Sequence, residues 1–286
     1  MSIKLENVSY TYGSGTPYEK LALKNINLEI NQGEFVGIIG HTGSGKSTLV
    51  QHLNGLLQPM TGLVTVNGVS LSGKDKATLA MRRKVGMVFQ YPEHQLFEET
   101  IALDIAFGPK NMGVPEEEID HRVREAMDFV GLDYKTFADR SPFRLSGGQM
   151  RRVAIAGVIV LRPDFLVLDE PSAGLDPSGR EEIFGEVMKW HRDRGMTVIL
   201  VSHNMEDISR MADRVIVLDQ GSIALDGDPL DIFESERPAL QAAGVDVPPV
   251  TELLEYLKSR DFVVPGRIRT VKEAVSAIYT VLKEGK

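Results

Sequence analysis

The first residues able to do chemistry form a glycine-rich loop, GHTGSGKST, at residues 40–48. They match the pattern G-x-x-x-x-G-K-[ST] of a phosphate-binding loop, between an apolar segment, FVGIIG, and a helical pattern. Backbone N–H groups point inward in such a loop, and the helix N-terminus adds positive potential. We expect Lys46 to reach the outer phosphates of a nucleotide and Ser47 to hold Mg2+. The predicted site comprises Gly40, His41, Thr42, Gly43, Ser44, Gly45, Lys46, Ser47 and Thr48.

An acidic pair, Asp169 and Glu170, closes the apolar segment FLVL. A bare Asp-Glu-Pro more often stabilises a helix N-terminus. With a phosphate loop in the same chain, we favour a catalytic interpretation. We expect Asp169 to hold Mg2+ and Glu170 to orient or deprotonate the water that attacks the terminal phosphate.

Three side chains outside these motifs are weaker candidates for the nucleotide site. His203 follows TVILVS, and open sheets place ligand residues at strand ends, although a lone histidine there is more often structural. Gln90 follows VGMVF, and its neutral amide suits contact with Mg2+ and water. Tyr12, in SYTYG, could stack on an adenine ring. Packing on an edge strand is an equal alternative for Tyr12, and Tyr10 competes for the same role.

A second glycine-rich loop, LSGGQ, lies about a hundred residues after the first, at residues 145–149. The sequence LSGGQMRRVAIAG indicates a helix start, whose free N–H groups and dipole favour an anion. This makes a second phosphate site of Ser146, Gly147, Gly148 and Gln149. One nucleotide does not need two such distant loops.

The elements that must position these residues follow from apolar patterning. Apolar and polar residues alternate in INLEI and in LVTV, and Asn67-Gly68 follows LVTV. This pattern predicts an antiparallel layer with a hairpin. Short continuous apolar runs separated by helical stretches predict a parallel sheet covered on both faces. The runs are VGMVF, FLVLD, TVILV and RVIVLD. From about 92 to 160 the pattern is mostly helical and polar, so we expect an inserted helical subdomain.

Composition bounds the function classes. The 286 residues are 42% apolar, with a formal net charge of -8, so no global positive field attracts nucleic acid and we expect no nucleic-acid partner. Two basic clusters, Arg82-Arg83-Lys84 and Arg151-Arg152, are interpreted as solvated helix faces. The longest apolar stretch, nine residues at 153–161, is too short to span a bilayer. Without cysteines or a signal-like start, the expected location is cytoplasmic.

The last part of the chain has a different pattern of apolar and polar residues. DVPP, at 246–249, predicts a linker, and two short amphipathic helices are expected after it. Thr270 to Glu273 form a predicted capping box. An apolar stripe follows at helical spacing, formed by Val271, Val275, Ile278 and Leu282. The stripe either folds back on its own domain or makes a subunit contact, and the sequence leaves both open.

Together these motifs resemble the nucleotide-binding subunit of an ABC transporter over about residues 1–230. The resemblance rests on Tyr12, GHTGSGKST, Gln90, LSGGQ, FLVLDEP, SAGLDP and His203, in this order and spacing. It implies an α/β fold of the P-loop NTPase ABC type, with an antiparallel β layer, the helical subdomain and a small C-terminal helical extension at 231–286. It also implies ATP as the ligand and hydrolysis to ADP and phosphate.

In that family two chains pair head to tail, so each ATP lies between the phosphate loop of one chain and the LSGGQ loop of the other. The resemblance therefore implies that the second loop serves the partner's nucleotide. Ser146 and Gly148 would contact the terminal phosphate of that ATP. Asp176 would lie at the dimer seam and link the two sites.

A finer resemblance joins the chain to the ATPases of energy-coupling factor (ECF) transporters, most closely to the second of their two ATPase subunits. It rests on YPEHQLFEETIALDIAFGPKNMG after Gln90, AIAG in the helix after LSGGQ, and DEPSAGLDP. It implies import of vitamins or transition-metal ions at the cytoplasmic face of the cell membrane. The implied partners are a second ATPase, as a heterodimer held partly by the C-terminal extension, a transmembrane scaffold subunit and a substrate-selecting membrane protein.

Within this resemblance, the segment after Gln90 forms a groove for a helix of the scaffold. Leu96 and Phe97 are adjacent apolar residues in a polar loop, so we expect them to be an exposed contact, with anchoring of the helical subdomain as the alternative. An ordinary ABC importer subunit for amino acids or inorganic ions is the second interpretation. A soluble ABC protein of translation or DNA repair is disfavoured, because the chain has a single cassette and no heptad run.

Overall fold

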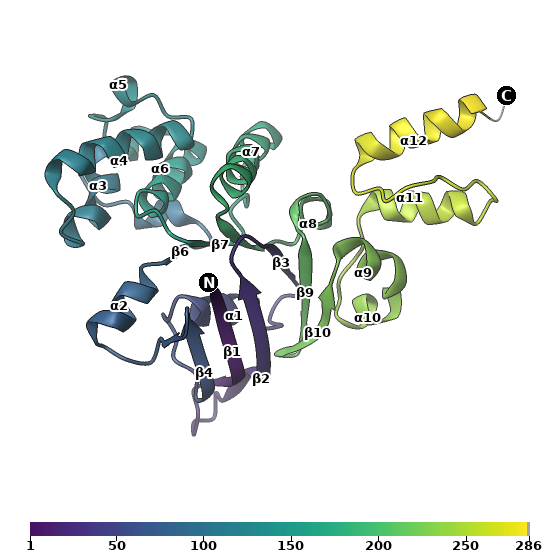
Figure 1. Ribbon diagram of the computed structural model, residues 1–286, viewed down its shortest axis with the longest axis horizontal. Helices are drawn as coiled ribbons and strands as arrows, with labels where there is room; N and C mark the ends of the chain where they lie inside the picture. Colours follow the sequence, from purple (N-terminus) through teal and green to yellow (C-terminus); the bar gives the residue numbers. More distant parts are fainter. Residues whose placement is uncertain (285–286) are drawn as a thin grey trace.

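The computed structural model describes residues 1–284 as an α/β fold built on two sheets (Figure 1). Gly285 and Lys286, the end of the predicted extension, lie outside the described residues. The central sheet has six strands in the order β10-β9-β3-β8-β7-β6, parallel except for β10. Its strands are β3 (Phe35–Ile39), β6 (Val85–Val88), β7 (Phe165–Asp169), β8 (Thr197–Val201), β9 (Arg214–Asp219) and β10 (Ser222–Gly227).

The apolar runs of the sequence form these parallel strands, as predicted. β3, β6, β7 and β8 are buried along their whole length because other elements cover both sheet faces. Asp169 pairs with Val201 in the register of β7 and β8. The carboxyl ends of these strands therefore meet at one edge of the sheet.

A second, antiparallel sheet has the order β2-β1-β4-β5. Its strands are β1 (Ser2–Tyr12), β2 (Lys20–Asn31), β4 (Thr61–Val66) and β5 (Val69–Ser70). Asn67 and Gly68, both with positive φ, join β4 to β5 in the predicted hairpin. The antiparallel layer expected from the alternating segments is confirmed.

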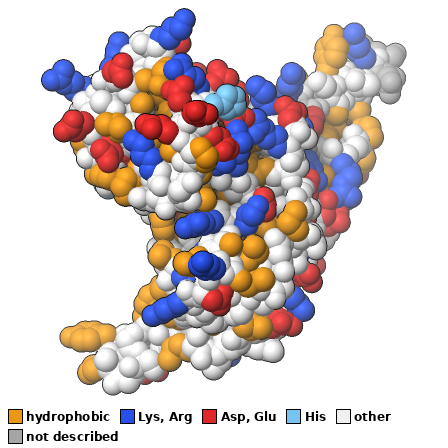
Figure 2. Space-filling view, turned by 60° about the vertical axis from the view of Figure 1, so that its left-hand side comes forward, with side chains coloured by type: hydrophobic (Ala, Val, Ile, Leu, Met, Phe, Trp, Pro, Cys, Tyr) orange, Lys and Arg blue, Asp and Glu red, His pale blue; other side chains and the backbone are white. Residues whose placement is uncertain are grey.

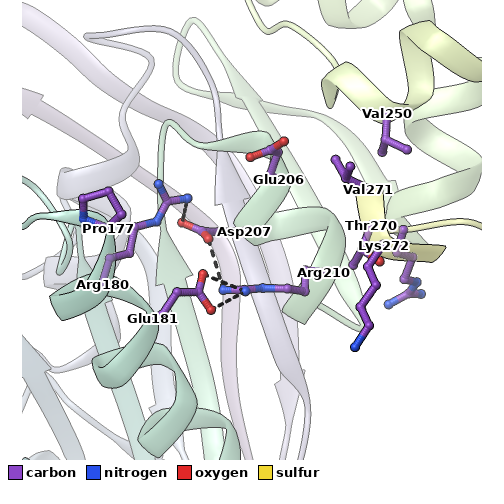
Figure 3. Close-up of a pocket in the computed structure, with 11 residues that line it drawn as sticks. Pro177, Arg180, Glu181, Glu206, Asp207, Arg210, Val250, Thr270, Val271 and Lys272 are labelled. Atoms are coloured by element: carbon purple, nitrogen blue, oxygen red, sulfur yellow. Dashed lines mark hydrogen bonds and ion pairs between the residues drawn. The ribbon is translucent and has the colours of Figure 1, made fainter. Parts of the chain in front are cut away.

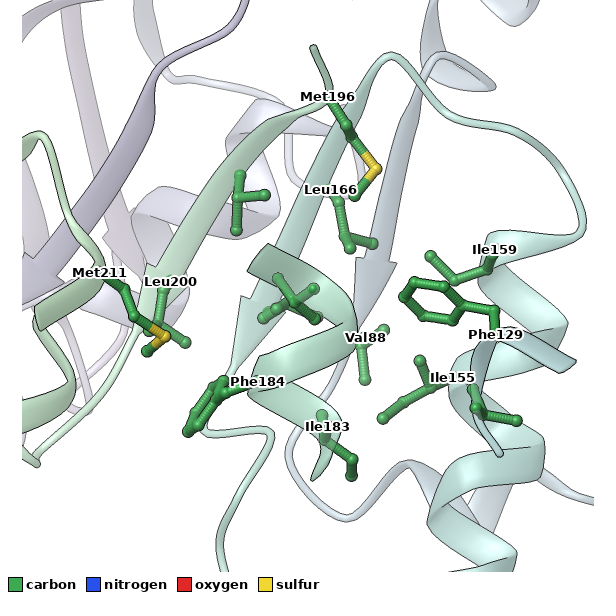
Figure 4. Packing of buried hydrophobic residues seen from close by; sticks show 14 of the residues in the cluster. Val88, Phe129, Ile155, Ile159, Leu166, Ile183, Phe184, Met196, Leu200 and Met211 are labelled. Carbon is green, nitrogen blue, oxygen red and sulfur yellow. The ribbon is translucent and has the colours of Figure 1, made fainter. Parts of the chain in front are cut away.

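Two apolar cores lie on opposite faces of the central sheet. One is shared with the antiparallel layer and α1 (Lys46–Leu53). The other lies under the helices that cover the second face, and Figure 4 shows Phe129 and Ile155 on the side of Val88 and Leu166, with Phe184 on the side of Leu200. Neighbouring residues of one strand, such as Leu166 and Val167, point into different cores, so the strand end is held from both sides.

A lobe of helices stands at one side of the sheets, at the upper left of Figure 1. Its elements are η1 (Pro92–Gln95), α3 (Ile101–Asn111), α4 (Glu116–Phe129), α5 (Tyr134–Phe137), η2 (Pro142–Arg144) and α6 (Gly147–Ile159). α6 packs against α3, α4 and η1. Outside the lobe, the sheets also carry α2 (Lys76–Arg82), α7 (Pro177–Arg194) and α8 (Met205–Met211).

The C-terminal part projects from the sheet edge formed by β10 (Figure 1). Its helices are α9 (Pro229–Ser235), α10 (Arg237–Ala242), α11 (Pro249–Lys258) and α12 (Val271–Glu284). The capping box is present, because Thr270 Oγ1 accepts from Glu273 N and Glu273 Oε2 accepts from Thr270 N. α12 packs on α11 through Ala274 and Ile278.

The predicted apolar stripe of α12 splits in the structure. Val271, Val275 and Leu282 remain 55%, 61% and 56% exposed. Of the two alternatives that the sequence leaves open, folding back on its own domain therefore describes only Ile278, which packs in the small core of the extension, while the other three residues stay exposed. No helix within residues 1–284 combines the length and apolar character needed to cross a membrane.

Candidate active site

The glycine-rich loop follows β3 and opens α1, between the two sheets. Gly40 has φ 148°, and a Cβ there would lie 2.3 Å from Leu218 O. Gly45, with φ 108°, would clash in the same way with Ala22 O at 2.6 Å. Only glycine fits at these two positions, because both the backbone angles and the neighbouring carbonyls exclude a side chain.

Lys46 is held on the loop itself. Its Nζ donates to Gly40 O at 2.7 Å and to His41 O at 3.0 Å. Burial lowers the pKa of Lys46, while the nearby carboxylates of Glu170 and Asp169 act in the opposite direction. The ammonium group is therefore positioned over the loop, where phosphate oxygens can replace the two carbonyls.

Asp169 ends β7 and is buried beside the first turn of α1. Burial raises the pKa of Asp169, and the Ser47 hydroxyl and the charge of Lys46 partly offset the rise. A hydroxyl, one carboxylate and the Gln90 amide all face one cavity. This donor set fits Mg2+, which usually takes one or two carboxylates and completes its shell with water and phosphate oxygens.

Glu170 adopts a positive φ of 51°, which is uncommon outside glycine. Burial, with the neighbouring Asp169 charge, raises its pKa to about 7. Its buried Oε1 accepts no hydrogen bond within residues 1–284. His203 Nε2, at the end of β8, lies 3.5 Å from that oxygen. Burial lowers the pKa of His203, and the Lys46 charge acts in the same direction.

These side chains line one cavity of about 310 Å3. Its lining comprises Tyr12, Lys20, Ala22, Thr42, Gly43, Gly45, Lys46, Ser47, Thr48, Gln90, Asp169, Glu170, Val201 and His203. Of the two candidate tyrosines, Tyr12 lines this cavity and Tyr10 does not. Tyr12 is partly exposed and pairs its hydroxyl with Thr48 Oγ1 at 3.3 Å. Tyr10 is half-buried, packing edge-to-face on His52 and against the apolar core.

Three residues of the predicted phosphate loop do not line the cavity. Gly40 supplies the close backbone approach, and the Ser44 side chain is fully buried. His41 turns toward β9, with Nε2 3.2 Å from Asp219 Oδ1. Lys20 is a cavity residue that sequence reasoning missed. Its Nζ lies 3.9 Å from the position of a Cβ on Gly43, and no motif surrounds it.

The LSGGQ loop lines a separate cleft of about 510 Å3, which shares no lining residue with the first cavity. Ser146 caps α6, with Ser146 Oγ accepting from Gln149 N at 3.3 Å and Gln149 Oε1 accepting from Ser146 N at 3.2 Å. Gly147 begins the helix, and Gly148 lines the cleft. Asp176 caps α7 across the same cleft, accepting from Gly179 N at 2.7 Å.

Ion pairs tie α7, which follows Asp176, to α8, which follows His203 (Figure 3). Arg180 Nη2 lies 2.7 Å from the buried Oδ2 of Asp207. Arg210 donates to Glu181 at 2.8 Å and lies 3.5 Å from Asp207 Oδ1. Burial raises the pKa of Asp207, against the effect of Arg180. These contacts join α7, whose cap Asp176 lines the second cleft, to α8, which begins after the cavity residue His203.

The segment after Gln90 corrects one expectation. Leu96 is only 7% exposed and belongs to the core under the helical lobe, so its predicted role as an exposed contact is wrong. Phe97 is 57% exposed and packs edge-to-face on Phe107, with ring centroids 4.8 Å apart. Phe107 is itself partly exposed. An apolar surface is therefore present, but it is formed by Phe97 and Phe107.

One of the two basic clusters, Arg151-Arg152, also differs from expectation. Arg151 is 3% exposed, so it is not part of a solvated face. Arg152 donates to Val130 O at 3.2 Å and to Glu182, which ties α6 to α7. On the face in Figure 2, acidic and basic side chains are interspersed over the helical lobe.

The fold and the two clefts define a P-loop ATPase of the ABC class. The family model described as "ABC transporter" matches residues 23–173, from β2 to the turn after Glu170. Solved structures agree. The structure of cbiO1 from Clostridium perfringens, part of the ABC transporter complex cbiONQ, is 37% identical with a TM-score of 0.73, over 88% of this chain and 98% of that one.

The chain belongs to the ABC transporter family and, within it, to the energy-coupling factor transporter ATP-binding proteins. Its curated relatives named EcfA2 include the protein of Clostridium perfringens, 53% identical over 99% of both chains. The EcfA2 of Caldanaerobacter subterraneus subsp. tengcongensis is also 53% identical, over 100% of this chain and 99% of its own length. A dimeric ATP-binding cassette, MJ0796, bound to ADP and Pi, is 33% identical with a TM-score of 0.70, over 79% of this chain and 98% of that one.

Proposed function

We propose that this chain is the ATP-hydrolysing motor subunit of an energy-coupling factor importer for vitamins or transition-metal ions. The observation that carries the proposal is the separation of two half-sites within one chain. The phosphate loop, Asp169 and Glu170 line one cavity, while Ser146, Gly148 and Asp176 belong to another cleft. A head-to-tail pair of chains brings complementary halves together.

In the first half-site, the phosphate loop cradles the triphosphate of ATP and Lys46 exchanges its carbonyl partners for phosphate oxygens. Tyr12 offers its ring to the adenine base. Ser47, Asp169 and Gln90 would hold Mg2+, which would neutralise charge on the phosphates. Lys20 adds a second cation at the cavity wall.

Glu170 is the group that activates water. Its carboxylate takes a proton as the water oxygen bonds to the terminal phosphorus, and the bond from that phosphorus to the bridging oxygen breaks, giving ADP and phosphate. A pKa of about 7 suits a base that works near neutral pH. His203, 3.5 Å from Glu170, orients the carboxylate and the terminal phosphate.

The second half-site serves a partner ATPase. Ser146 and Gly148 contact the terminal phosphate of the partner's ATP from the start of α6, where free N–H groups favour an anion. Asp176 lies at the seam between the two chains. The dimeric cassette with ADP and Pi supports this arrangement, because it is similar to this chain over most of its length.

The surface of the chain offers two contacts for further subunits. The exposed residues Val271, Val275 and Leu282 on α12 suit the partner ATPase. Phe97, in the segment after Gln90, and Phe107, which packs on Phe97, suit a helix of the transmembrane scaffold. A separate membrane protein selects the substrate. The chain then works at the cytoplasmic face of the membrane, held there by its partners.

Co-purification tests the proposal. The tagged chain is expressed in its own cells, extracted from membranes in mild detergent and purified, and the proteins bound to it are identified by mass spectrometry. We expect a second, different ATPase and small membrane proteins, with ATP hydrolysis in the purified complex. A chain that purifies alone, or only with itself, contradicts the heteromeric importer.

A further inference from the structure

Arg151 is a buried cation that the proposed ATPase chemistry does not use. It lies on α6, two residues after the LSGGQ loop, and is 3% exposed. A buried charge is costly unless it is paired and hydrogen-bonded. The hydrogen-bond partners of Arg151 therefore indicate its role.

The guanidinium joins three segments that are far apart in sequence. Its Nε and Nη2 each donate to the Glu93 carboxylate at 3.1 Å, and Nη1 donates to Ala173 O. Glu93 lies on η1, three residues after Gln90. Ala173 lies in the turn after Glu170, three residues before Asp176, and its own N–H donates to Glu170 O at 3.2 Å.

Among side chains, only the planar guanidinium group of arginine can make these three contacts together. Two donors on one edge of the guanidinium take both oxygens of Glu93, and a third donor is left for the carbonyl. The ammonium of a lysine keeps the charge but cannot hold the same bidentate contact. The exposed pair of Arg124 with Asp120, both about half exposed, has no such constraint and contributes little.

We propose that Arg151 is a positioning residue that couples the segment after Gln90 and the turn after Glu170 to the LSGGQ helix. A shift of the segment after Gln90 is then passed to the LSGGQ helix and to the turn after Glu170, because the Arg151 side chain joins all three. The proposal rests on the proposed function, since it assigns the route by which that motor connects the membrane contact to its two half-sites.

The experiment uses the complete complex in lipid vesicles. ATP hydrolysis and substrate uptake are measured for the wild type, Arg151→Met, Glu93→Gln, the double variant, Arg151→Lys, and the matched surface control Arg124→Met. Binding of a fluorescent ATP analogue to the Lys46 loop and a thermal melt are measured for each variant. Glu93→Gln keeps the size of the side chain and leaves an amide oxygen that can accept from Arg151, so it is a second variant if Arg151→Met does not fold.

We expect kcat to fall about tenfold in Arg151→Met and in Glu93→Gln, with KM for ATP and analogue binding within about twofold of the wild type. The double variant falls no further than either single one, because one contact is lost in each case. Arg151→Lys recovers part of the loss, and Arg124→Met behaves as the wild type.

Two results overturn the proposal. One is a folded Arg151→Met or Glu93→Gln complex with wild-type hydrolysis and uptake. The other is a fall in kcat that a lower melting temperature explains by itself. In that case the two single effects on kcat add in the double variant, and Arg151→Lys does not recover activity. Failure of the proposed function looks different, because the wild-type complex itself would then lack ATP hydrolysis or uptake.

Discussion

His203 and Glu170 face each other at the carboxyl ends of neighbouring strands, with Nε2 3.5 Å from Oε1. Glu170 is held by its backbone, since its N–H donates to Val201 O at 3.1 Å on the strand that leads to His203. The parallel pairing of β7 and β8 therefore sets the spacing of the two side chains. This relationship places a carboxylate of raised pKa against the phosphate loop.

Replacing Glu170 by glutamine should keep ATP binding and lower hydrolysis by at least about a hundredfold, since the amide cannot accept the proton of the water. Phosphate release per site on the assembled complex measures the effect. Glu117→Gln, an exposed change on α4, is the matched control. Near-normal turnover in the Glu170 variant would reject its role as the base.

The pH dependence follows from the same group. The pKa of Glu170 is raised to about 7 and a base works deprotonated, so kcat/KM should rise with pH. The ionised fraction grows from roughly a tenth at pH 6 to roughly nine tenths at pH 8, so the rise should approach tenfold. A lowered pKa keeps His203 neutral through most of this range. A profile that is flat or falls between pH 6 and 8 would contradict the assignment.

Lys46→Ala should weaken ATP binding itself, because the ammonium held on the Gly40 and His41 carbonyls is lost from the phosphate site. A loss of about tenfold or more in affinity is expected for a charged contact to phosphate. Isothermal titration with ATP gives the affinity. Lys110→Ala, on the exposed side of α3, serves as control. Unchanged affinity in the Lys46 variant would count against the phosphate-loop assignment.

Ser146→Arg should damage the site built on the partner's phosphate loop and leave ATP bound at Lys46 of this chain. The reason is that Ser146 lines the cleft that is separate from the Lys46 cavity. Trapping of a labelled nucleotide, assigned to each chain after cross-linking, measures it. Ser72→Arg, in an exposed loop, controls for the added charge. Loss of label from this chain alone would contradict the head-to-tail arrangement.

Phe97→Glu and Leu96→Ala should act on different properties. The first should release the membrane scaffold in a pull-down and leave the melt of the ATPase unchanged, because Phe97 is largely exposed. The second should lower the free energy of unfolding by about 2–5 kcal/mol, as expected for truncating a buried leucine. Phe143→Glu, at another exposed phenylalanine of the same lobe, is the control. Retained pull-down with Phe97→Glu would exclude this contact.

The sequence alone determined the local chemistry. GHTGSGKST needs its glycines for backbone angles, and FLVLDEP brings an acidic pair to the end of a buried strand, so short-range patterns identified both. The parallel strands and the antiparallel layer were predicted for the same reason, since period and apolar run length are properties of a short segment.

Only the tertiary structure decided burial, exposure and pairing. Leu96 and Phe97 are neighbours with equal apolar character, yet one lies in the core and the other on the surface, because α3 and the rest of the lobe cover only one side of their segment. The sequence pattern predicts a solvated Arg151, whereas in the structure it donates to the Glu93 carboxylate and to Ala173 O. Such outcomes depend on which distant elements pack together, and no local pattern encodes that.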